Sequence, residues 1–299
     1  MPATTAPPHP PQPPHPPHPH KTWFITGTSS GIGRQLTELL LVRGCRVAAT
    51  ARRTETLDDL AAEHGDRLRV LSLDVTDTPA VRRVVDEAFA AFGRIDVVVN
   101  NAGYGLFGAA EELTDEQIAR QLATNLTGSI QVARAALPHL REQGGGRIVQ
   151  ISSIGGQIAF PLLSLYHATK WGIEGFFESL RQEVAPFGIQ TTIVEPGAIR
   201  TAFIDRGLDQ AAPLEAYEAT DLGEFRRSML AGTAIDPIGD PARLARAVID
   251  SADQDPAPSR LVLGSDAYEM GRTALTQRLA DLEAQRGVAY STDAEDGRG

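Results

Sequence analysis

Tyr166 and Lys170, four positions apart, are the pair of residues best suited to proton transfer in this chain. If their segment is helical, both side chains lie on one face, one turn apart. The nearby ammonium would favour the phenolate and bring the tyrosine pKa down from about 10 towards the working range. Tyr166 would then serve as a general acid or base. Alone the motif is weak, because most such pairs are a surface tyrosine beside a solvated lysine.

A serine hydroxyl is expected close to this pair. Ser153 ends the apolar run 147–153, which predicts a buried parallel strand. Open α/β sheets bind ligands at the carboxyl ends of their strands, so the hydroxyl would emerge at a binding site.

Composition places the chain among ordinary globular proteins, with 42% hydrophobic and 22% charged residues in 299. A net charge of -10, without a lysine or arginine stripe, disfavours nucleic acids and anionic membranes as partners. No apolar run approaches the roughly 20 residues of a membrane helix, and the N-terminus lacks a signal-peptide layout. The single cysteine, Cys45, indicates a small buried residue in a reducing, cytoplasmic setting.

Residues 2–20 hold half of the chain's 20 prolines and four of its seven histidines, so they predict a tail and not a folded segment. Such a composition favours an extended, solvated polyproline-type conformation, and residues 1–20 are excluded from the fold. Metal capture by these histidines is the alternative to an inert tail. Outside it no Cys or His cluster has ligand spacing, so no metal site is predicted.

From residue 21 onwards, apolar runs alternate with amphipathic stretches. This alternation predicts an α/β fold with a doubly wound, parallel, seven-stranded sheet in three α/β/α layers. One domain would span residues 21–288, followed by a polar tail at 289–299. The predicted strands are 22–26, 46–50, 68–74, 95–100, 147–152, 190–195 and 260–263, and the predicted helices are 33–43, 54–64, 79–92, 114–143, 166–184 and 240–252.

A glycine-rich turn lies between the first predicted strand and the helix after it. Glycines let backbone amides approach a pyrophosphate, and the helix N-terminus adds partial positive charge. This context predicts phosphate binding, although the spacing differs from the usual Gly-x-Gly-x-x-Gly and a turn without a ligand is the alternative. The residues predicted to hold the phosphates are Gly27, Ser29, Ser30, Gly31, Ile32 and Gly33.

The ends of the next two strands would contact the adenosine half of a dinucleotide. Arg52 stands where NAD-binding folds carry an acidic residue, and an arginine there suits the 2′-phosphate of NADP(H). A solvated loop arginine is the alternative, since Arg53 is adjacent. Asp74 and Val75 end the third strand, where a side chain could reach the adenine, or Asp74 could cap the following helix.

Small and polar residues after the fourth strand, Asn101, Ala102 and Gly103, would let the chain pass close to a flat cofactor. Asn125 lies inside a long helical pattern, where asparagine is a poor helix former. It indicates either a kink with a function or a tolerated polar residue.

Together these motifs resemble the short-chain dehydrogenase/reductase family across residues 21–265. The resemblance implies a Rossmann-type domain that binds a nicotinamide dinucleotide and interconverts a ketone or aldehyde and an alcohol. The matching motifs are Thr26-Gly-x-x-x-Gly-x-Gly33, Asn100-Asn-Ala-Gly103, Asn125, Ser153, Tyr166-x-x-x-Lys170 and Pro196-Gly197.

The same resemblance implies roles for the catalytic candidates. Tyr166 would give a proton to the carbonyl, and Ser153 would polarise its oxygen. Lys170 would lower the tyrosine pKa and hold the nicotinamide ribose, and Asn125 would anchor a water that leads protons to the lysine. Ser153 fits better than Ser152, because the family's serine stands thirteen positions before the tyrosine.

Further residues are implied near the nicotinamide: Pro196, Gly197, Ile199 and Thr201. Ser30 stands where relatives that prefer NADP(H) carry a basic residue, so this preference depends mainly on Arg52. Because enzymes that use NADP(H) tend to work in the direction of reduction, we expect a reductase.

Residues 198–236 lie where a lid over the site would sit. Their apolar side chains, with others near the motifs, indicate a pocket for a hydrophobic ketone or secondary alcohol. The equally favoured alternative is that they pack the lid onto its own domain. They are Tyr104, Phe107, Phe160, Leu162, Leu163, Phe203, Ile204, Leu208, Leu214, Tyr217, Leu222, Phe225 and Met229.

Two other classes of protein and the assembly state stay open. A dinucleotide-binding sensor or scaffold usually lacks one of Ser, Tyr or Lys, whereas a sugar-nucleotide epimerase or dehydratase favours Gly-x-x-Gly-x-x-Gly. The resemblance implies a homodimer or homotetramer built on helices 114–143 and 166–184. A helix predicted at 265–286 could cover the substrate cleft or an assembly surface.

Overall fold

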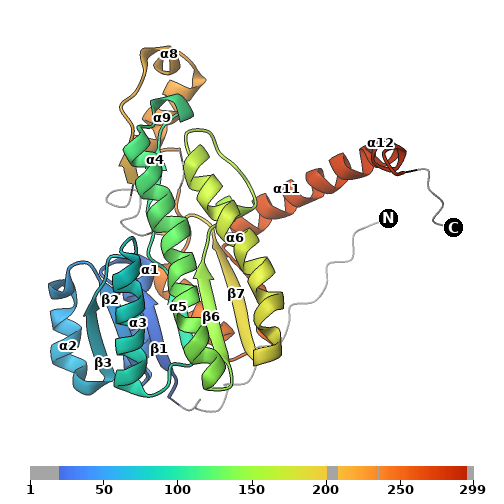
Figure 1. Ribbon diagram of the computed structural model, residues 1–299. Coiled ribbons are helices and arrows are strands. Elements are labelled where there is room, and N and C mark those ends of the chain that lie inside the picture. The colour runs from blue at the N-terminus through green and yellow to red at the C-terminus, as the bar shows by residue number, and fades with distance from the viewer. Residues whose placement is uncertain (1–19, 201–207, 235, 295–299) are drawn as a thin grey trace, which may run out of the picture.

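Seven strands form one parallel sheet, as predicted (Figure 1). The computed structural model describes residues 20–200, 208–234 and 236–294. The strands begin and end within two residues of the predicted runs, because buried Val, Ile and Leu define both. They are β1 (Thr22–Thr26), β2 (Arg46–Ala51), β3 (Leu68–Ser72), β4 (Val97–Asn100), β6 (Gly146–Ile151), β7 (Ile189–Pro196) and β9 (Arg260–Leu263).

The strand order is β3-β2-β1-β4-β6-β7-β9, so the sheet grows in opposite directions from β1. The chain first adds β2 and β3 on one side, then crosses over to place β4 on the other. The carboxyl ends of β1 and β4 therefore lie side by side at the reversal, where open α/β sheets bind their ligands.

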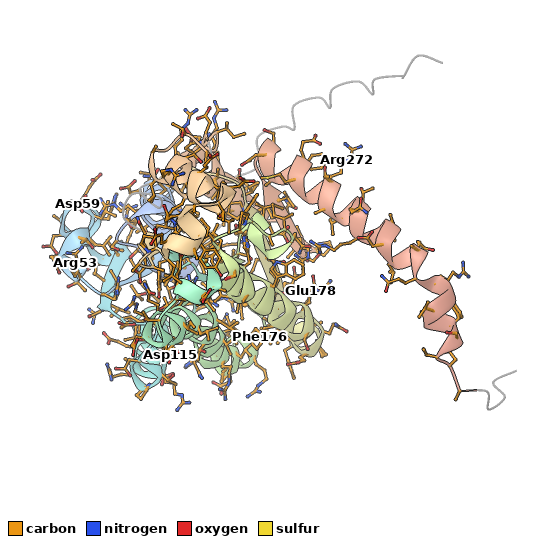
Figure 2. The ribbon with its side chains drawn as sticks, turned by 90° about the horizontal axis from the view of Figure 1, so that it is seen from above. Arg53, Asp59, Asp115, Phe176, Glu178 and Arg272 are labelled. Carbon is orange, nitrogen blue, oxygen red and sulfur yellow. The ribbon has the colours of Figure 1, made fainter. Side chains whose placement is uncertain are left out.

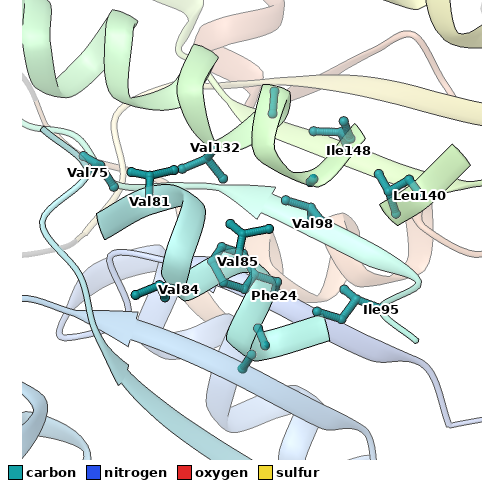
Figure 3. Packing of buried hydrophobic residues seen from close by; sticks show 14 of the residues in the cluster. Phe24, Val75, Val81, Val84, Val85, Ile95, Val98, Val132, Leu140 and Ile148 are labelled. Atoms are coloured by element: carbon teal, nitrogen blue, oxygen red, sulfur yellow. The ribbon is translucent and has the colours of Figure 1, made fainter. Parts of the chain in front are cut away.

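Helices cover both faces of the sheet and divide the core in two. On β1, Phe24 faces a cluster that includes α3, α5 and α6, whereas Trp23 and Ile25 face a cluster that includes α1, α2 and α10. Figure 3 shows the first cluster, with Phe24 close to Val85. These helices are α1 (Gly31–Val42), α2 (Asp58–His64), α3 (Thr78–Phe92), α5 (Ser129–Glu142), α6 (Ser164–Val184) and α10 (Pro241–Ser251).

The predicted helix over 114–143 consists of three consecutive parts. α4 (Asp115–Gln121) passes into a π-helical segment (Leu122–Gly128), which continues into α5. A π-helical segment widens the turn and redirects the side chains that follow it. The kink that Asn125 indicated lies in this segment.

The predicted lid region has secondary structure of its own. β5 (Gly105–Phe107) pairs in parallel with β8 (Leu208–Gln210), a pairing that was not predicted. Beyond β8 follow α8 (Glu215–Glu218) and α9 (Asp221–Leu230), which lie near α4 at the top of Figure 1. Thr201, Phe203 and Ile204 lie outside the described residues.

The C-terminal segment extends away from the sheet. α11 (Ser265–Ala284) follows β9, and α12 (Arg286–Ser291) continues beyond it (Figure 1). The polar tail predicted from residue 289 therefore begins later, because the chain stays helical through Ser291. The predicted tail at 1–20 lies outside the described residues except for residue 20.

Candidate active site

The turn between β1 and α1 has the shape that a phosphate group requires. Gly27 and Gly31 have φ of 70° and 58°, in the left-handed region that favours glycine. A Cβ on Gly33 would lie 2.4 Å from the Gly27 carbonyl oxygen, so the turn closes only with glycine there. Ser30 precedes α1 without capping it through its side chain, and the first turn holds no acidic residue. The N–H groups of this turn therefore suit an anion such as pyrophosphate.

Asn101 and Thr26 lock this turn to the end of β4. The Asn101 Nδ2 donates to the carbonyl oxygens of Thr26 and Gly27 at 2.8 and 3.0 Å. The Thr26 hydroxyl accepts from the backbone nitrogens of Asn101 and Ala102, both at 3.0 Å. Asn101 and Ala102 thus hold the turn in shape. Sequence reasoning gave no role to Thr26, although its place at the end of β1 was a usable signal.

The residues predicted to contact the adenosine lie at the outer strand ends. Arg52 follows β2 and is exposed, as is Asp74 beyond β3, whereas Val75 is buried. Asp74 does not cap α3: its carboxylate accepts from the Thr76 backbone nitrogen at 2.9 Å. The cap is Asp77, which accepts from the Ala80 nitrogen at 3.0 Å.

Ser153, Tyr166 and Lys170 come together at the carboxyl end of β6. A hydrogen bond joins the Ser153 and Tyr166 hydroxyls. The Lys170 Nζ lies 5.6 Å from the centre of the Tyr166 ring and donates to the Ile151 carbonyl oxygen at 3.1 Å. The i to i+4 spacing on α6 therefore places the ammonium beside the phenol ring, as predicted.

The expected lowering of the Tyr166 pKa is wrong for this arrangement. Burial raises the pKa of the phenol to about 12, which outweighs the lowering by the hydrogen bond with Ser153. Burial also lowers the pKa of Lys170, to about 8. Both shifts have one cause, since removal from water disfavours the charged form of either group. Residue spacing revealed the neighbouring ammonium but not the desolvation.

Ser152 has a different partner from Ser153. Its hydroxyl donates to the Glu174 Oε1 at 2.6 Å, and both groups are buried. Successive side chains of an extended segment point in opposite directions, so the two serines are separated by geometry. Of these two serines, the structure places Ser153 beside Tyr166.

Glu174 is the centre of a buried charge network beneath the site. Its Oε2 accepts from the Arg260 guanidinium and from the Gln157 amide, each at 2.6 Å. Arg260 also contacts Glu195 on β7 and donates to Glu178 on α6 at 2.9 Å. The negative charge of Glu174 acts to raise the pKa of both Tyr166 and Lys170. Its i+8 position from the tyrosine was a signal that sequence reasoning missed.

Glu174→Gln is expected to shift the pH dependence of turnover to lower pH. The amide keeps an acceptor for Ser152 but removes the charge that acts to raise the pKa of Lys170, so the lysine loses its proton at lower pH. A pH profile of kcat measures the shift. Glu178→Gln is the matched control, because Glu178 also binds Arg260. If the Glu174→Gln enzyme is slower but the pH profile of its kcat is unchanged, the role of Glu174 is only structural.

Asn125 is buried in the π-helical segment and holds the backbone after Gly103. Its Oδ1 accepts from the Tyr104 nitrogen at 3.0 Å, and its Nδ2 donates to the Tyr104 oxygen at 2.8 Å. A Cβ on Gly103 would approach this amide to 3.3 Å. The polar residue is thus structurally required at the kink, since it satisfies both backbone groups of Tyr104.

His167 fixes the loop that joins Ser153 to α6. The Nδ1 atom of its ring lies 2.8 Å from the Gly155 oxygen. The Nε2 atom accepts a hydrogen bond from the Phe160 nitrogen at 2.9 Å. This pairing requires the neutral ring with its proton on Nδ1. Burial lowers the pKa of His167, which maintains that form. The loop ends with Leu162 at φ 63°, a strained backbone whose oxygen accepts from Gly108 at 2.8 Å.

The loop after β7 is fixed by α11. The Ala198 nitrogen donates to the Asp266 Oδ2 at 2.7 Å, and a Cβ on Gly197 would lie 2.3 Å from this carboxylate. Gly197 is therefore required by packing. Ile199 continues the loop through a bridge to Gly239, and Pro196 ends β7.

A buried ion pair attaches α9, in the predicted lid region, to the body. Arg226 on α9 donates to both carboxylate oxygens of Glu112 at 2.6 Å, and its Nε lies 2.6 Å from the Glu218 Oε1. Glu112 also accepts from the Leu214 nitrogen at 2.9 Å. Burial acts to raise the Glu112 pKa, but these hydrogen bonds outweigh it and lower the pKa. This attachment was not predicted.

Apolar contacts accompany this ion pair. Phe107, Leu162 and Met229 are buried in one cluster, so these residues follow the alternative in which the lid packs onto its own domain. Leu163, Leu208, Tyr217 and Phe225 pack against the same cluster. Phe160 and Tyr104 are half-buried near the site.

Over the described ranges, the structure contains no group of three or more His, Cys, Asp or Glu side chains that could hold a metal ion. None of the helices described here is long and apolar enough to cross a membrane. Cys45 is half-buried and not fully buried as expected, and burial raises its pKa.

A glycine turn that suits a phosphate, at the reversal of a doubly wound sheet and beside a Ser-Tyr-Lys cluster, is the arrangement of a dinucleotide-dependent oxidoreductase. Comparisons with known proteins agree. The family model for short chain dehydrogenases matches residues 21–211. Oxidoreductase BOA17 of Botryotinia fuckeliana (strain B05.10) is 41% identical over 273 residues, which cover 91% of this chain and 99% of that protein.

Solved structures give the same result. A short-chain dehydrogenase from Streptomyces avermitilis is 41% identical with a TM-score of 0.84, over 91% of this chain and 98% of that one. ElxO, solved with NADP bound, is 30% identical with a TM-score of 0.67, over 82% of this chain and 96% of that one. The chain belongs to the short-chain dehydrogenase/reductase family.

Proposed function

We propose that this oxidoreductase uses NADP(H) to reduce an apolar ketone or aldehyde to the alcohol, with Tyr166 as the proton donor. The observation that carries the proposal is the position of the Tyr166 phenol, hydrogen-bonded to Ser153 and beside Lys170. Burial raises the pKa of the phenol to about 12, so Tyr166 holds a proton at neutral pH that it can give to a carbonyl oxygen.

Each residue of the cluster has one task in this proposal. Ser153 donates to the carbonyl oxygen and so polarises it, and Tyr166 then gives its proton to the developing alkoxide. Lys170 supplies positive charge beside the phenolate left behind. Asn125 keeps the backbone at Tyr104 in place beside the cluster. The reduced nicotinamide supplies the hydride when bound.

The cofactor would be held by groups that the turn already presents. Gly27, Gly31 and Gly33 suit the pyrophosphate, with Ser29 and Ser30 exposed at the same turn. Arg52 is proposed for the 2′-phosphate because it is exposed directly after β2, at the strand end where an arginine suits this group. NADP bound to the similar protein ElxO also supports this choice.

Arg52→Asp should weaken NADPH binding by about 10–100-fold, because a charged hydrogen bond to phosphate is worth about 1.5–3 kcal/mol. NADH binding should not weaken, since the new carboxylate can accept from the ribose hydroxyls. Titration of both cofactors measures the change. Arg53→Asp, the adjacent exposed arginine, is the control. Equal losses in both variants would indicate a general charge effect and remove Arg52 from the site.

Turnover tests the reaction itself. The purified chain with NADPH should oxidise the cofactor in the presence of apolar ketones, followed by the loss of reduced-nicotinamide absorbance. Turnover confined to small, charged compounds would contradict an apolar substrate. The apolar pocket would lie beside the half-buried Phe160 and Tyr104, next to the apolar cluster of Phe107, Leu162 and Met229. NADPH binding without turnover of any carbonyl compound would favour a dinucleotide-binding sensor or scaffold.

A cytoplasmic location and a homo-oligomer belong to this proposal as well. The location is proposed because the single cysteine, Cys45, is free, which is typical of a reducing compartment. The homo-oligomer follows from the family, with the helical segment from α4 through α5 and with α6 as its expected contact surface.

A further inference from the structure

α11 and α12 carry a dense set of exposed apolar side chains. Of the large apolar side chains exposed in the described part of the chain, nearly half lie in these two helices: Tyr268, Leu275, Leu279, Leu282, Val288 and Tyr290. Their exposed fractions run from 51% to 70%. Exposed apolar side chains gathered in one segment in this way indicate a contact site.

Only the first part of α11 packs against its own domain. Ala267 and Gly271 are buried, and Gly271 lies against Ile154. The last contact with α6 is the guanidinium of Arg278, 4.7 Å from the centre of the Trp171 ring. From residue 279 to 294 every residue is exposed, and Figures 1 and 2 show the helix leaving the body in two perpendicular views. A helical end of this length is marginal in water without a partner.

Four of these six side chains lie along one face of α11. Leu275, Leu279 and Leu282 stand at i, i+4 and i+7, which puts them on one helix face. Tyr268 stands seven residues before Leu275 and lies on the same face. This is the pattern of a helix that packs against another helix.

The charges on α11 indicate which partner it binds and whether the two helices run parallel or antiparallel. Arg272 precedes Arg278, which still contacts α6, and Asp281 and Glu283 follow it. Arg272 has a 3.5 Å pair with Glu269 in its own helix. In an antiparallel pair centred near Gln277, Leu275 meets the partner's Leu279. Arg272 then lies opposite the partner's Leu282, between the partner's Asp281 and the partner's Glu283. A parallel pair would oppose like charges at each of these positions.

We infer that α11 is a dimerisation helix, which pairs antiparallel with α11 of a second copy of this chain. The pairing is two-fold symmetric and self-complementary, so it closes as a dimer and each substitution acts twice. This interface differs from the α5 and α6 surface that the family resemblance implies, and it is independent of the proposed reaction.

The test is the mass of the full chain in solution, by light scattering after size exclusion and by sedimentation. Leu275→Gln with Leu279→Gln should weaken assembly at least about a hundredfold, because four leucines leave the interface. Val42→Gln is the matched control, since Val42 is 76% exposed on α1. NADPH binding and circular dichroism report whether each variant is folded.

Charge reversal tests the direction of the pair. Arg272→Glu should weaken assembly, and Arg272→Glu with Asp281→Arg and Glu283→Arg should restore it. A monomeric wild-type chain, a mass unchanged by the leucine substitutions, or failure of the triple variant to reassemble would each overturn the inference. So would a monomer that binds lipid vesicles through this face of α11, since a membrane would then be the partner.

Discussion

Tyr166→Phe is expected to lower kcat by about 10²–10⁴-fold, the usual contribution of a positioned general acid. The ring stays packed beside Lys170, so only the hydroxyl and its bond with Ser153 are lost. NADPH should bind nearly as before, because the glycine turn and Arg52 are unchanged. Single-turnover rates and cofactor titrations measure the two quantities.

The control for this variant is Tyr268→Phe, an exposed tyrosine on α11 that lies outside the cluster. It should leave kcat and cofactor affinity at wild-type values. A Tyr166→Phe enzyme that keeps its rate would exclude Tyr166 from the mechanism. In the wild type, the rate of reduction should fall as pH rises through about 8, where Lys170 loses its charge.

Arg226→Met should release the lid. Removal of one partner from a buried ion pair leaves an uncompensated charge, a loss of about 3–5 kcal/mol. Here the uncompensated group is Glu112, whose side chain is fully buried. Amide hydrogen exchange in α9 should accelerate at least about a hundredfold, with the strands of the sheet unaffected. An apolar substrate should also bind more weakly, which would raise KM.

Arg227→Met is the matched control, because Arg227 is the next residue on α9 and its side chain is exposed. Its ion pair with Glu218, at 3.3 Å, is longer than the contacts of Arg226. Exchange in α9 should stay close to wild type in this variant. Equal acceleration in both variants would show that Arg226 matters through its helix and not through Glu112. Because the Glu112 pKa is lowered in the fold, the ion pair stabilises the lid above the ordinary carboxyl pKa. That stabilisation is lost as pH falls through the lowered value.

The sheet and the residues at its strand ends could be predicted from sequence because their signals are local. Runs of buried Val, Ile and Leu mark the strands, and helical spacing brings Tyr166 and Lys170 together. Parts that depend on distant contacts could not be predicted. The Arg226–Glu112 pair joins residues 114 positions apart, and β5 with β8 joins segments nearly as distant.

The direction of the Tyr166 pKa illustrates the same limit. Spacing identifies the charges near a group, but desolvation depends on how loops and strands close around it. Around Tyr166, these parts are the loop held by His167 and the hydrogen-bond network at Glu174. His167 and Glu174 stand within eight positions of the tyrosine, yet their partners are found only in the folded chain.

The neighbouring serines have a consequence for reading relatives of this protein. Two identical residues in a row look like redundancy, but Ser152 is no spare for Ser153: it faces away, with its hydroxyl committed to Glu174. A one-residue shift of the chain within β6 would exchange the two faces, whereas a change in the length of the loop before α6 would not. Sequence alignments of such proteins should therefore be judged by the register of the serine at the end of β6, and not by the presence of a serine.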